Sequence, residues 1–397
     1  MEIRNTRELK QYNKFIILNE IIQNQPVSRK DLTKKMDASH ATISYIVKDL
    51  IEEGLVIETE VMESNGGRPP RLLEFKGSSK FLIAVEINDQ ILFYSIFNLN
   101  LELIRKGSFN TEELTAEKII ELLHNKIVKD LEELRIDHNK LVGLGVSTPG
   151  IYEEDIDCLI NSTSKIWEGR NLKKEFEKYF SLPIYIENDA NLAAYYEWAY
   201  GAGRGYSNLI YFYIADGIGG GIIINNQLYK GIHGKAGEVG HMKVKEDGEK
   251  CDCGGIGCLE TISSIKAIRK EVNRRISNGE KSNLLHYHQP PYNADEIIKA
   301  YREGDSLSRK IINQAFYYLI NALSSVINFF DPGLLILGDM HDLIDDELIE
   351  RIRKGLKQIC FHNIMEKLDI IRKTDKENHL QMYATAAFVF DNWKKTV

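Results

Sequence analysis

The strongest constraint in this 397-residue sequence is a group of three cysteines next to a histidine. Cys251, Cys253 and Cys258 lie within eight residues, and His241 precedes the first of them by ten. Three thiolates and one imidazole make a closed tetrahedral ligand set that suits zinc and leaves no position for water. We therefore predict a structural Zn²⁺ site. The alternative is three reduced, buried thiols that gather through packing alone.

The length and net charge of the chain limit its possible domain organisation and binding partners. With 397 residues, 43% of them hydrophobic, the chain can build two or three cores. Its net charge of -7 excludes binding to nucleic acid through bulk positive charge, so any DNA contact must come from a local patch. The sequence has no bilayer-length apolar run and no secretory signal pattern at its start. We expect a cytoplasmic protein without a membrane partner.

Residues 1–75 have the pattern of a helix-turn-helix. Apolar residues recur at helical spacing over residues 15–22. Ser28 followed three residues later by Asp31 predicts a capped second helix, and Ser39 opens a third that ends at Gly54. Small polar residues at the start of this third helix are typical of a recognition helix in the major groove.

A basic wing is predicted after the third helix. Segments 55–62 and 71–75 alternate like two strands, and the loop between them reads SNGGRPPR. A basic loop of this kind is often ordinary solvent-exposed surface. When it follows a helix-turn-helix pattern in the sequence, however, it favours DNA binding. We therefore predict a winged helix-turn-helix domain over residues 1–75. Its predicted contacts with a double-stranded DNA operator are Arg29, Lys30, Ser39, His40, Thr42, Ser44, Tyr45, Lys48, Arg68 and Arg71.

The remaining residues alternate between strand and helix patterns. Strand-like runs at 81–87, 91–99 and 141–147 surround a helix at about 116–134. A second such unit follows, with a glycine-rich turn expected at 216–221. This order predicts an α/β body of two lobes with ligands at strand ends.

Several short motifs carry a family resemblance. They are GGRPP at 66–70, GVSTPG at 145–150, IENDAN at 186–191, GAGRG at 201–205, GEVGH at 237–241, the cysteine segment through Glu260, and LLILGD at 334–339. With them, essentially the whole chain resembles the ROK family of bacterial repressors and sugar kinases, which share a two-lobed, actin-like, ribonuclease-H-like fold. We place the lobes at 76–190 and 191–397, with the zinc site in the second and the last helix able to pack back on the first.

The resemblance also implies a sugar pocket. Its lining would be Asn188, Asp189, Glu238, His241 and Glu260. Carboxylates and an amide suit this role because a sugar hydroxyl both donates and accepts hydrogen bonds. His241 could bind zinc through one ring nitrogen and offer the other to a hydroxyl, which would couple pocket and metal.

The phosphate-binding turns of the family's kinases are altered in this sequence. Their Asp-x-Gly-Gly-Thr turn corresponds here to residues 86–90, which include Asp89, and their Gly-Thr-Gly turn corresponds to Ala215-Asp216-Gly217. An added carboxylate about 4 Å from a phosphate oxygen costs on the order of 4 kcal/mol at an effective dielectric near 20. We therefore predict no enzyme activity and no catalytic residue, and we interpret Asp189 as a vestigial kinase base that is retained for sugar binding.

Together these features predict a sugar-responsive transcriptional repressor of carbohydrate-utilisation genes. A homo-oligomer, dimer or tetramer, would bind the operator and release it when a monosaccharide such as xylose enters the pocket. Within the family, the intact sugar pocket and degraded phosphate turns look most like the xylose-repressor branch. Two alternatives remain, namely a residual ATP-dependent sugar kinase and a regulator that is sequestered by a transporter protein.

Overall fold

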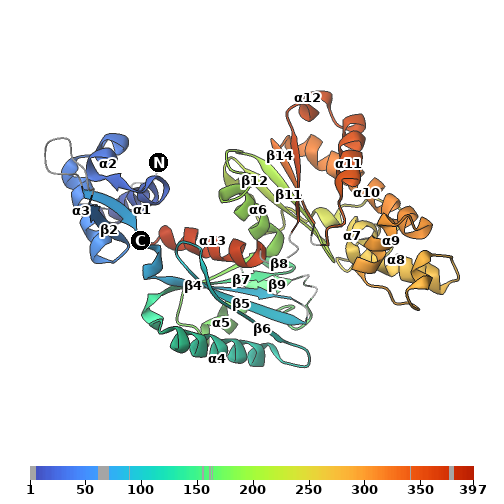
Figure 1. Ribbon diagram of the computed structural model, residues 1–397, viewed down its shortest axis with the longest axis horizontal. Coiled ribbons are helices and arrows are strands. Elements are labelled where there is room, and N and C mark those ends of the chain that lie inside the picture. Colours follow the sequence, from blue (N-terminus) through green and yellow to red (C-terminus); the bar gives the residue numbers. More distant parts are fainter. Residues whose placement is uncertain are drawn as a thin grey trace. The chain divides into compact units, whose positions relative to one another are not determined.

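The computed structural model describes residues 6–60, 71–88, 90–153, 156–160, 162, 164–339, 341–374 and 380–397. The chain forms two compact units (Figure 1). The first contains residues 1–147, 173–186 and 385–397, and the second contains residues 148–172 and 187–384. In the described ranges, no helix has the length and apolar composition that crossing a bilayer requires.

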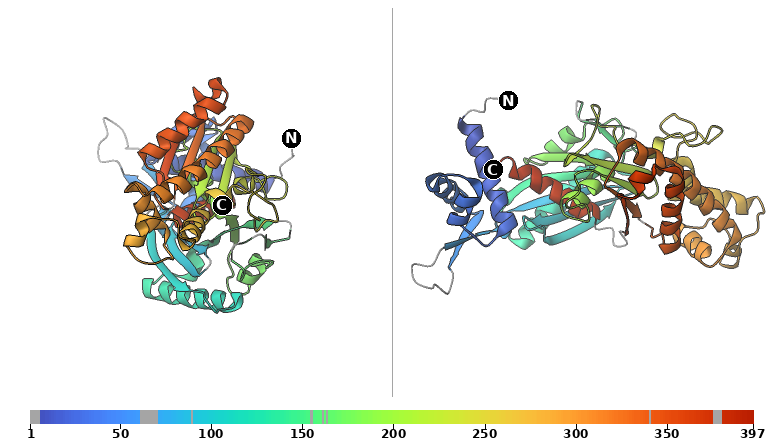
Figure 2. Two further views of the ribbon diagram at one scale, coloured as in Figure 1. Left: turned by 90° about the vertical axis from the view of Figure 1, so that its right-hand side faces the viewer. Right: turned by 90° about the horizontal axis from the view of Figure 1, so that it is seen from above.

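The N-terminal part of the chain up to Phe75, which we call the head, contains three helices and a small sheet and is coloured blue in Figure 2. Its elements are α1 (Thr6–Asn24), β1 (Val27–Ser28), α2 (Arg29–Met36), α3 (His40–Glu52), β2 (Val56–Glu60) and β3 (Arg71–Phe75). The strands pair antiparallel in the order β1-β3-β2. The predicted caps are confirmed: Ser28 and Asp31 form a capping box, and the Ser39 side chain accepts from the Thr42 N–H. These elements make the predicted winged helix-turn-helix.

A five-stranded sheet of order β10-β7-β4-β5-β6 forms the first lobe. Its strands are β4 (Phe81–Ile87), β5 (Ile91–Asn98), β6 (Leu103–Asn110), β7 (Leu141–Thr148) and β10 (Ile184–Asn188). The helices are α4 (Ala116–Leu134), α5 (Leu172–Glu177) and, from Thr385 onward, α13 (Leu380–Lys394). The small β8 (Ile151–Glu153) and β9 (Cys158–Ile160) pair antiparallel in the second unit.

The second unit is built on a sheet of order β13-β12-β11-β14-β15. Its strands are β11 (Leu209–Ile214), β12 (Ile218–Ile224), β13 (Gln227–Leu228), β14 (Leu334–Asp339) and β15 (Asp369–Thr374). Its helices are α6 (Asp189–Ala199), α7 (Glu260–Ser263), α8 (Ile265–Ser277), α9 (Ala294–Arg302), α10 (Ser306–Phe330), α11 (Asp346–Ile359) and α12 (His362–Met365).

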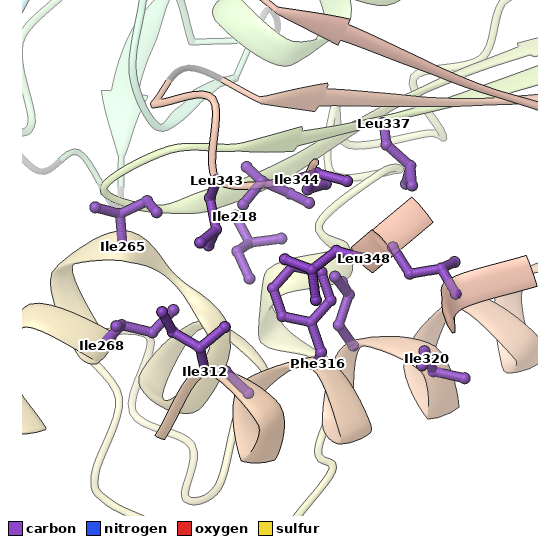
Figure 3. Packing of buried hydrophobic residues seen from close by; sticks show 14 of the residues in the cluster. Ile218, Ile265, Ile268, Ile312, Phe316, Ile320, Leu337, Leu343, Ile344 and Leu348 are labelled. Carbon is purple, nitrogen blue, oxygen red and sulfur yellow. The ribbon is translucent and has the colours of Figure 1, made fainter. Parts of the chain in front are cut away.

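Alternation along β11 gives this sheet two apolar faces. Ile210 and Phe212 belong to the large core under α8–α11, whereas Leu209 and Tyr211 belong to a smaller core under α6. Figure 3 shows the large core, with side chains of α10 such as Phe316 pointing toward the sheet. The sheet therefore holds α6 firmly, with the N-terminus of α6 next to Asn188.

The glycine-rich turn expected at 216–221 is partly wrong. The turn is confined to Ala215–Gly217, where the Ala215 N–H donates to the Gly217 carbonyl at 2.9 Å, and the next three glycines lie inside β12. A Cβ on Gly221 would lie 2.3 Å from the Ala194 Cβ and 2.6 Å from the Ala190 carbonyl oxygen. These glycines therefore let α6 approach the strand closely, a packing need that no local sequence signal reveals.

The compact units divide the chain at different places from the lobes expected at 76–190 and 191–397. Residues 148–172 group with the second unit. Asn188 Nδ2 donates to the Gly150 carbonyl at 2.9 Å and so ties this segment to the start of α6, while within the segment Ser162 Oγ donates to the Pro149 carbonyl at 3.1 Å. The segment after β7 is thus fixed beside the start of α6.

Candidate functional site

The predicted zinc ligands come together in the second unit. The ligand atoms of His241, Cys251, Cys253 and Cys258 all lie within 4.8 Å of one another. His241 Nδ1 is 3.5 Å from Cys251 Sγ, and Cys253 Sγ is 3.7 Å from Cys258 Sγ. Ligands about 2.0–2.3 Å from a tetrahedral zinc ion would be separated by about 3.5–3.8 Å. The four residues therefore fit a metal ion of this kind.

The surroundings of the three thiols shift their pKa values. Burial raises the pKa of the Cys258 thiol to about 12 and raises that of Cys251 as well. Although burial opposes it, the Gly255 N–H, 3.4 Å from Cys253 Sγ, lowers the pKa of Cys253. A cation among the sulfurs would stabilise the thiolate forms that burial disfavours.

His241 joins the cysteine cluster to the expected sugar residues. It ends the one-turn 3₁₀ helix Val239–His241, with Nδ1 toward the cysteines. Nε2 faces the other way and lies 3.6 Å from Glu238 Oε2. Both side chains are half-buried, with 26% and 32% exposure respectively.

Asn188 and Asp189 lie at the junction of β10 and α6. Asn188 caps α6 because its side chain accepts from the Asn191 N–H at 3.1 Å, while its amide donates to Gly150. Asp189 Oδ1 accepts from the Ala190 N–H at 2.8 Å. Asn188 and Asp189 are therefore both tied by hydrogen bonds to the backbone at the start of α6.

Glu260 begins α7, two residues after Cys258. Its Oε2 accepts from the Ile218 N–H at 3.0 Å, which ties it to the first residue of β12. A Cβ on Gly217 would lie only 2.8 Å from the same oxygen, so a side chain at this position would require the Glu260 carboxylate to shift. Glu260 is thus positioned by the same strand that supports α6.

Three carboxylates interact electrostatically at this site. Burial raises the pKa of Asp189 to about 6. Burial, together with the negative charges of Asp189 and Glu260, raises the pKa of Glu238 to about 7. Near neutral pH the group is therefore partly protonated. It can both donate hydrogen bonds to sugar hydroxyls and accept hydrogen bonds from them, which suits a neutral polyol.

The turns expected to repel phosphates are partly described. Asp89 lies outside the described residues. Beside it, Asn88 Nδ2 donates to Glu86 Oε1 at 3.0 Å, so this amide binds a carboxylate. Asp216 is exposed in the turn before β12.

The predicted DNA contacts lie mostly on the outer face of α3. Ser39, His40, Thr42, Tyr45 and Lys48 are exposed and Ser44 is half-buried, while Ile43, Ile46, Val47 and Leu50 face the core. Ser39 also caps the helix, and Lys48 pairs with Glu52 at 3.6 Å. Lys30 is exposed on α2, and Arg68 lies outside the described residues.

Two predicted DNA contacts are held by an acid that the sequence pattern did not reveal. Glu58 of β2 pairs with Arg71 at 2.5 Å and also with Arg29. The bonds from Arg71 and Arg29 hold the pKa of Glu58 below its usual range despite partial burial. Tyr45, another predicted DNA contact, also has a partner from a different helix, since Lys10 of α1 donates to its hydroxyl at 2.9 Å.

Comparison with known proteins places these features in a family. The ROK family model matches residues 83–391, and the MarR family model matches residues 11–62. The chain is 30% identical to a xylose repressor of Caldicellulosiruptor bescii over 359 residues, which cover 89% of each chain. It is also 30% identical to a xylose repressor of Bacillus subtilis over 341 residues, 85% of this chain and 84% of the relative.

Other similar proteins share the architecture at lower identity. The DNA-binding transcriptional dual regulator NagC of Escherichia coli is 25% identical over 371 residues, 94% of this chain and 91% of the relative. A solved ROK family transcriptional regulator, described as a homolog of the E. coli MLC protein, has a TM-score of 0.85 at 24% identity and covers 98% of both chains. A ROK family glucokinase from Streptomyces griseus covers 78% of this chain and 98% of its own, with a TM-score of 0.65 at 24% identity.

The ROK family model covers most of the chain, and the MarR family model covers the head. The solved ROK regulator resembles the chain over the head and the body together. The chain therefore belongs to the ROK family and carries a MarR-like winged helix-turn-helix in front of an actin-like ROK body.

Proposed function

We propose that this protein is a cytoplasmic, sugar-responsive transcriptional repressor of carbohydrate-utilisation genes, and that a monosaccharide such as xylose releases it from its operator. The observation that carries the proposal is one chain with an exposed recognition helix and a separate cluster of carboxylates joined to a Cys₃His set. The names of the xylose repressors and of NagC point the same way.

In the proposed pocket, each polar side chain has a distinct task. Asp189 and Glu238 accept hydrogen bonds from hydroxyls, and in their protonated forms they also donate. Glu260 keeps one oxygen on the Ile218 N–H and offers the other. His241 presents Nε2, and Asn188 holds the start of α6 in place. A site of half-buried, directed polar groups discriminates between epimers because a misplaced hydroxyl leaves a partner unsatisfied.

We propose that His241, Cys251, Cys253 and Cys258 bind a structural zinc ion. A bound zinc ion would fix the loop between His241 and Glu260 and the orientation of the imidazole. Because all four ligands come from the protein, this site would stabilise the fold and would not activate water.

Helix α13 offers a route from pocket to head. Near its start, Gln381 Nε2 donates to the Asp189 carbonyl at 3.1 Å. Near its end, the Phe390 ring lies 6.1 Å from that of Phe75 in the wing strand β3. We propose that sugar binding shifts the backbone at Asp189 and that α13 carries this shift to the wing. Such coupling needs only a few kcal/mol of differential affinity between the two states.

The experiment is a titration of labelled DNA from upstream of the protein's own gene. Fluorescence anisotropy is measured without sugar and with xylose, glucose or N-acetylglucosamine. We expect tight DNA binding that one sugar weakens in wild type but not in Asp189→Asn. The matched control, Glu246→Gln, changes an exposed acid outside the pocket and should respond like wild type.

Two results would contradict the proposal. Sugar-dependent formation of ADP from ATP would instead support a residual kinase, for which the retained Asp189 and the fold shared with the Streptomyces griseus glucokinase are the grounds. DNA binding that no sugar in a broad panel changes would instead favour a regulator that is sequestered by a transporter protein.

A further inference from the structure

A pocket that the proposed function does not use lies within the second unit. Its volume is about 560 Å³, inside the range of about 300–1,000 Å³ that is typical of small-molecule sites. The turn after α6, the first residues of β14 and β15, and the helices α11 and α12 line it. None of its lining residues is a proposed sugar or zinc ligand. We call it the β15 pocket, after the strand that contributes residues 369–371.

Much of the lining of the β15 pocket is aliphatic. Leu334 and Leu368 are buried, and Met365 and Ile371 are half-buried. Side chains of this kind offer a hydroxyl no good hydrogen-bond partner, so a polyol such as a sugar would lose bonds to water on entering. A ligand with a hydrocarbon or aromatic body would instead bury apolar surface favourably.

Two cations from α11 also line the β15 pocket. Arg353 and Lys357 are four residues apart and therefore lie on the same face of the helix. Arg353 Nη2 donates to the Ile370 carbonyl at 2.8 Å, which holds the guanidinium against β15, and Nη1 pairs with Glu350. Lys357 is exposed and has no ion-pair partner within the described residues. Its ammonium group is therefore free to pair with an anionic ligand.

The one acid in the lining already has a partner. The Tyr206 hydroxyl donates to Asp369 Oδ2, and both residues line the pocket. A ligand with two negative charges would bring the second of them into a pocket that also holds this carboxylate, which is unfavourable. A ligand with a single negative charge can place it at the α11 side and turn an uncharged body toward β15.

We propose that the β15 pocket binds a small organic carboxylate with a branched aliphatic or aromatic body. The carboxylate pairs with Lys357 and Arg353, and the body packs on the aliphatic lining. A neutral hydrocarbon would remove water from these cations without replacing its hydrogen bonds, whereas a carboxylate makes charge-assisted hydrogen bonds with them. The inference goes beyond the proposed function because it involves neither sugar nor DNA.

The test is calorimetric titration of the full-length protein with benzoate and with 4-methylpentanoate, each compared with its uncharged amide. We expect at least one carboxylate to bind with a dissociation constant of about 1 mM or lower, and its amide to bind about tenfold more weakly or not at all. Inorganic phosphate should also bind more weakly than that carboxylate, because it lacks an apolar body. No binding of either carboxylate, or equal binding of its amide or of phosphate, would overturn the proposal.

Substitutions locate the binding site. Lys357→Gln should raise the dissociation constant of the carboxylate about tenfold, whereas the matched control Lys354→Gln, which changes an exposed lysine of α11 that does not line the pocket, should leave it unchanged. Ala202→Trp adds a large side chain at an exposed lining position and should abolish binding. Wild-type affinity in Lys357→Gln or Ala202→Trp would contradict the assignment.

One further variant separates this proposal from the proposed function. Asp189→Asn alters the candidate sugar site and should bind the carboxylate like wild type, since Asp189 does not line the β15 pocket. Loss of carboxylate binding in Asp189→Asn would place the ligand in the sugar site and overturn the inference. Absence of any sugar response would contradict the proposed function alone, because carboxylate binding is measured without sugar.

Discussion

Replacing Gly221 with alanine tests how the candidate sugar site is held against its sheet. The new Cβ would lie 2.3 Å from the Ala194 Cβ and 2.6 Å from the Ala190 carbonyl oxygen, whereas carbon atoms in contact are normally about 3.5–4.0 Å apart. Helix α6 would therefore have to move by about 1 Å or more. Overpacking of this kind typically costs about 1–3 kcal/mol of unfolding free energy. Asp189 begins this helix, so the displacement reaches the pocket.

Two measurements check this expectation. Urea unfolding of Gly221→Ala should give a free energy of unfolding that is lower by that amount, and calorimetric titration should give about tenfold weaker sugar binding, since a displacement near 1 Å is enough to misplace a binding group. Adding Ala194→Gly removes the Cβ–Cβ contact but leaves the contact with Ala190, so the double variant should recover only part of the loss. Wild-type stability and wild-type sugar affinity in Gly221→Ala would refute the idea that close packing of α6 on β12 supports the pocket.

Three further predictions concern the acid, the metal and the helix that leaves the pocket. Because burial raises the pKa of Asp189 from 3.8 to about 6, the stability from its protonated form is complete below pH 4 and is lost as the pH rises through 6. Urea unfolding of wild type relative to Asp189→Asn should therefore lose about 1–2 kcal/mol between pH 4 and pH 7, a value discounted for partial exposure. Cys253→Ser should lower both the zinc content, measured by mass spectrometry, and the affinity for sugar. Unchanged zinc content and sugar affinity would contradict the proposed coupling. The control is Cys158→Ser, which changes a cysteine outside the cluster. Phe390→Ala should bind sugar normally but release DNA less, and full sugar-induced release in the anisotropy assay would exclude α13 as the route.

Features that depend on neighbouring residues could be predicted from the sequence. The caps at Ser28 and Ser39 and the end of α3 at Gly54 are set within three or four residues, and the structure has each of them. The Cys₃His set is equally local, because its four members lie within a span of eighteen residues whose glycines permit tight turns.

Features that depend on long-range packing could not be predicted in the same way. The glycines of β12 have the pattern of a turn until α6 is placed against them. Glu58 holds Arg29 and Arg71, but its place in an alternating strand pattern gives no sign of that role. The bond from Gln381 to Asp189 spans 192 residues. Each requires the three-dimensional packing before a partner can be assigned.

Strand β12 supports both the Cys₃His set and the carboxylates of the candidate sugar site. On one side, α6 with Asp189 rests on its glycines. On the other, a Cβ on Gly240 would lie 2.1 Å from the Ile218 carbonyl oxygen, so the loop that carries Glu238 and His241 also lies directly on the strand. Glu260 binds the Ile218 N–H. A change at the cysteines therefore reaches the carboxylates by two short paths, through the imidazole and through the chain from Cys258 to Glu260. Loss of metal should consequently weaken sugar binding even though no proposed metal ligand except His241 also belongs to the proposed pocket.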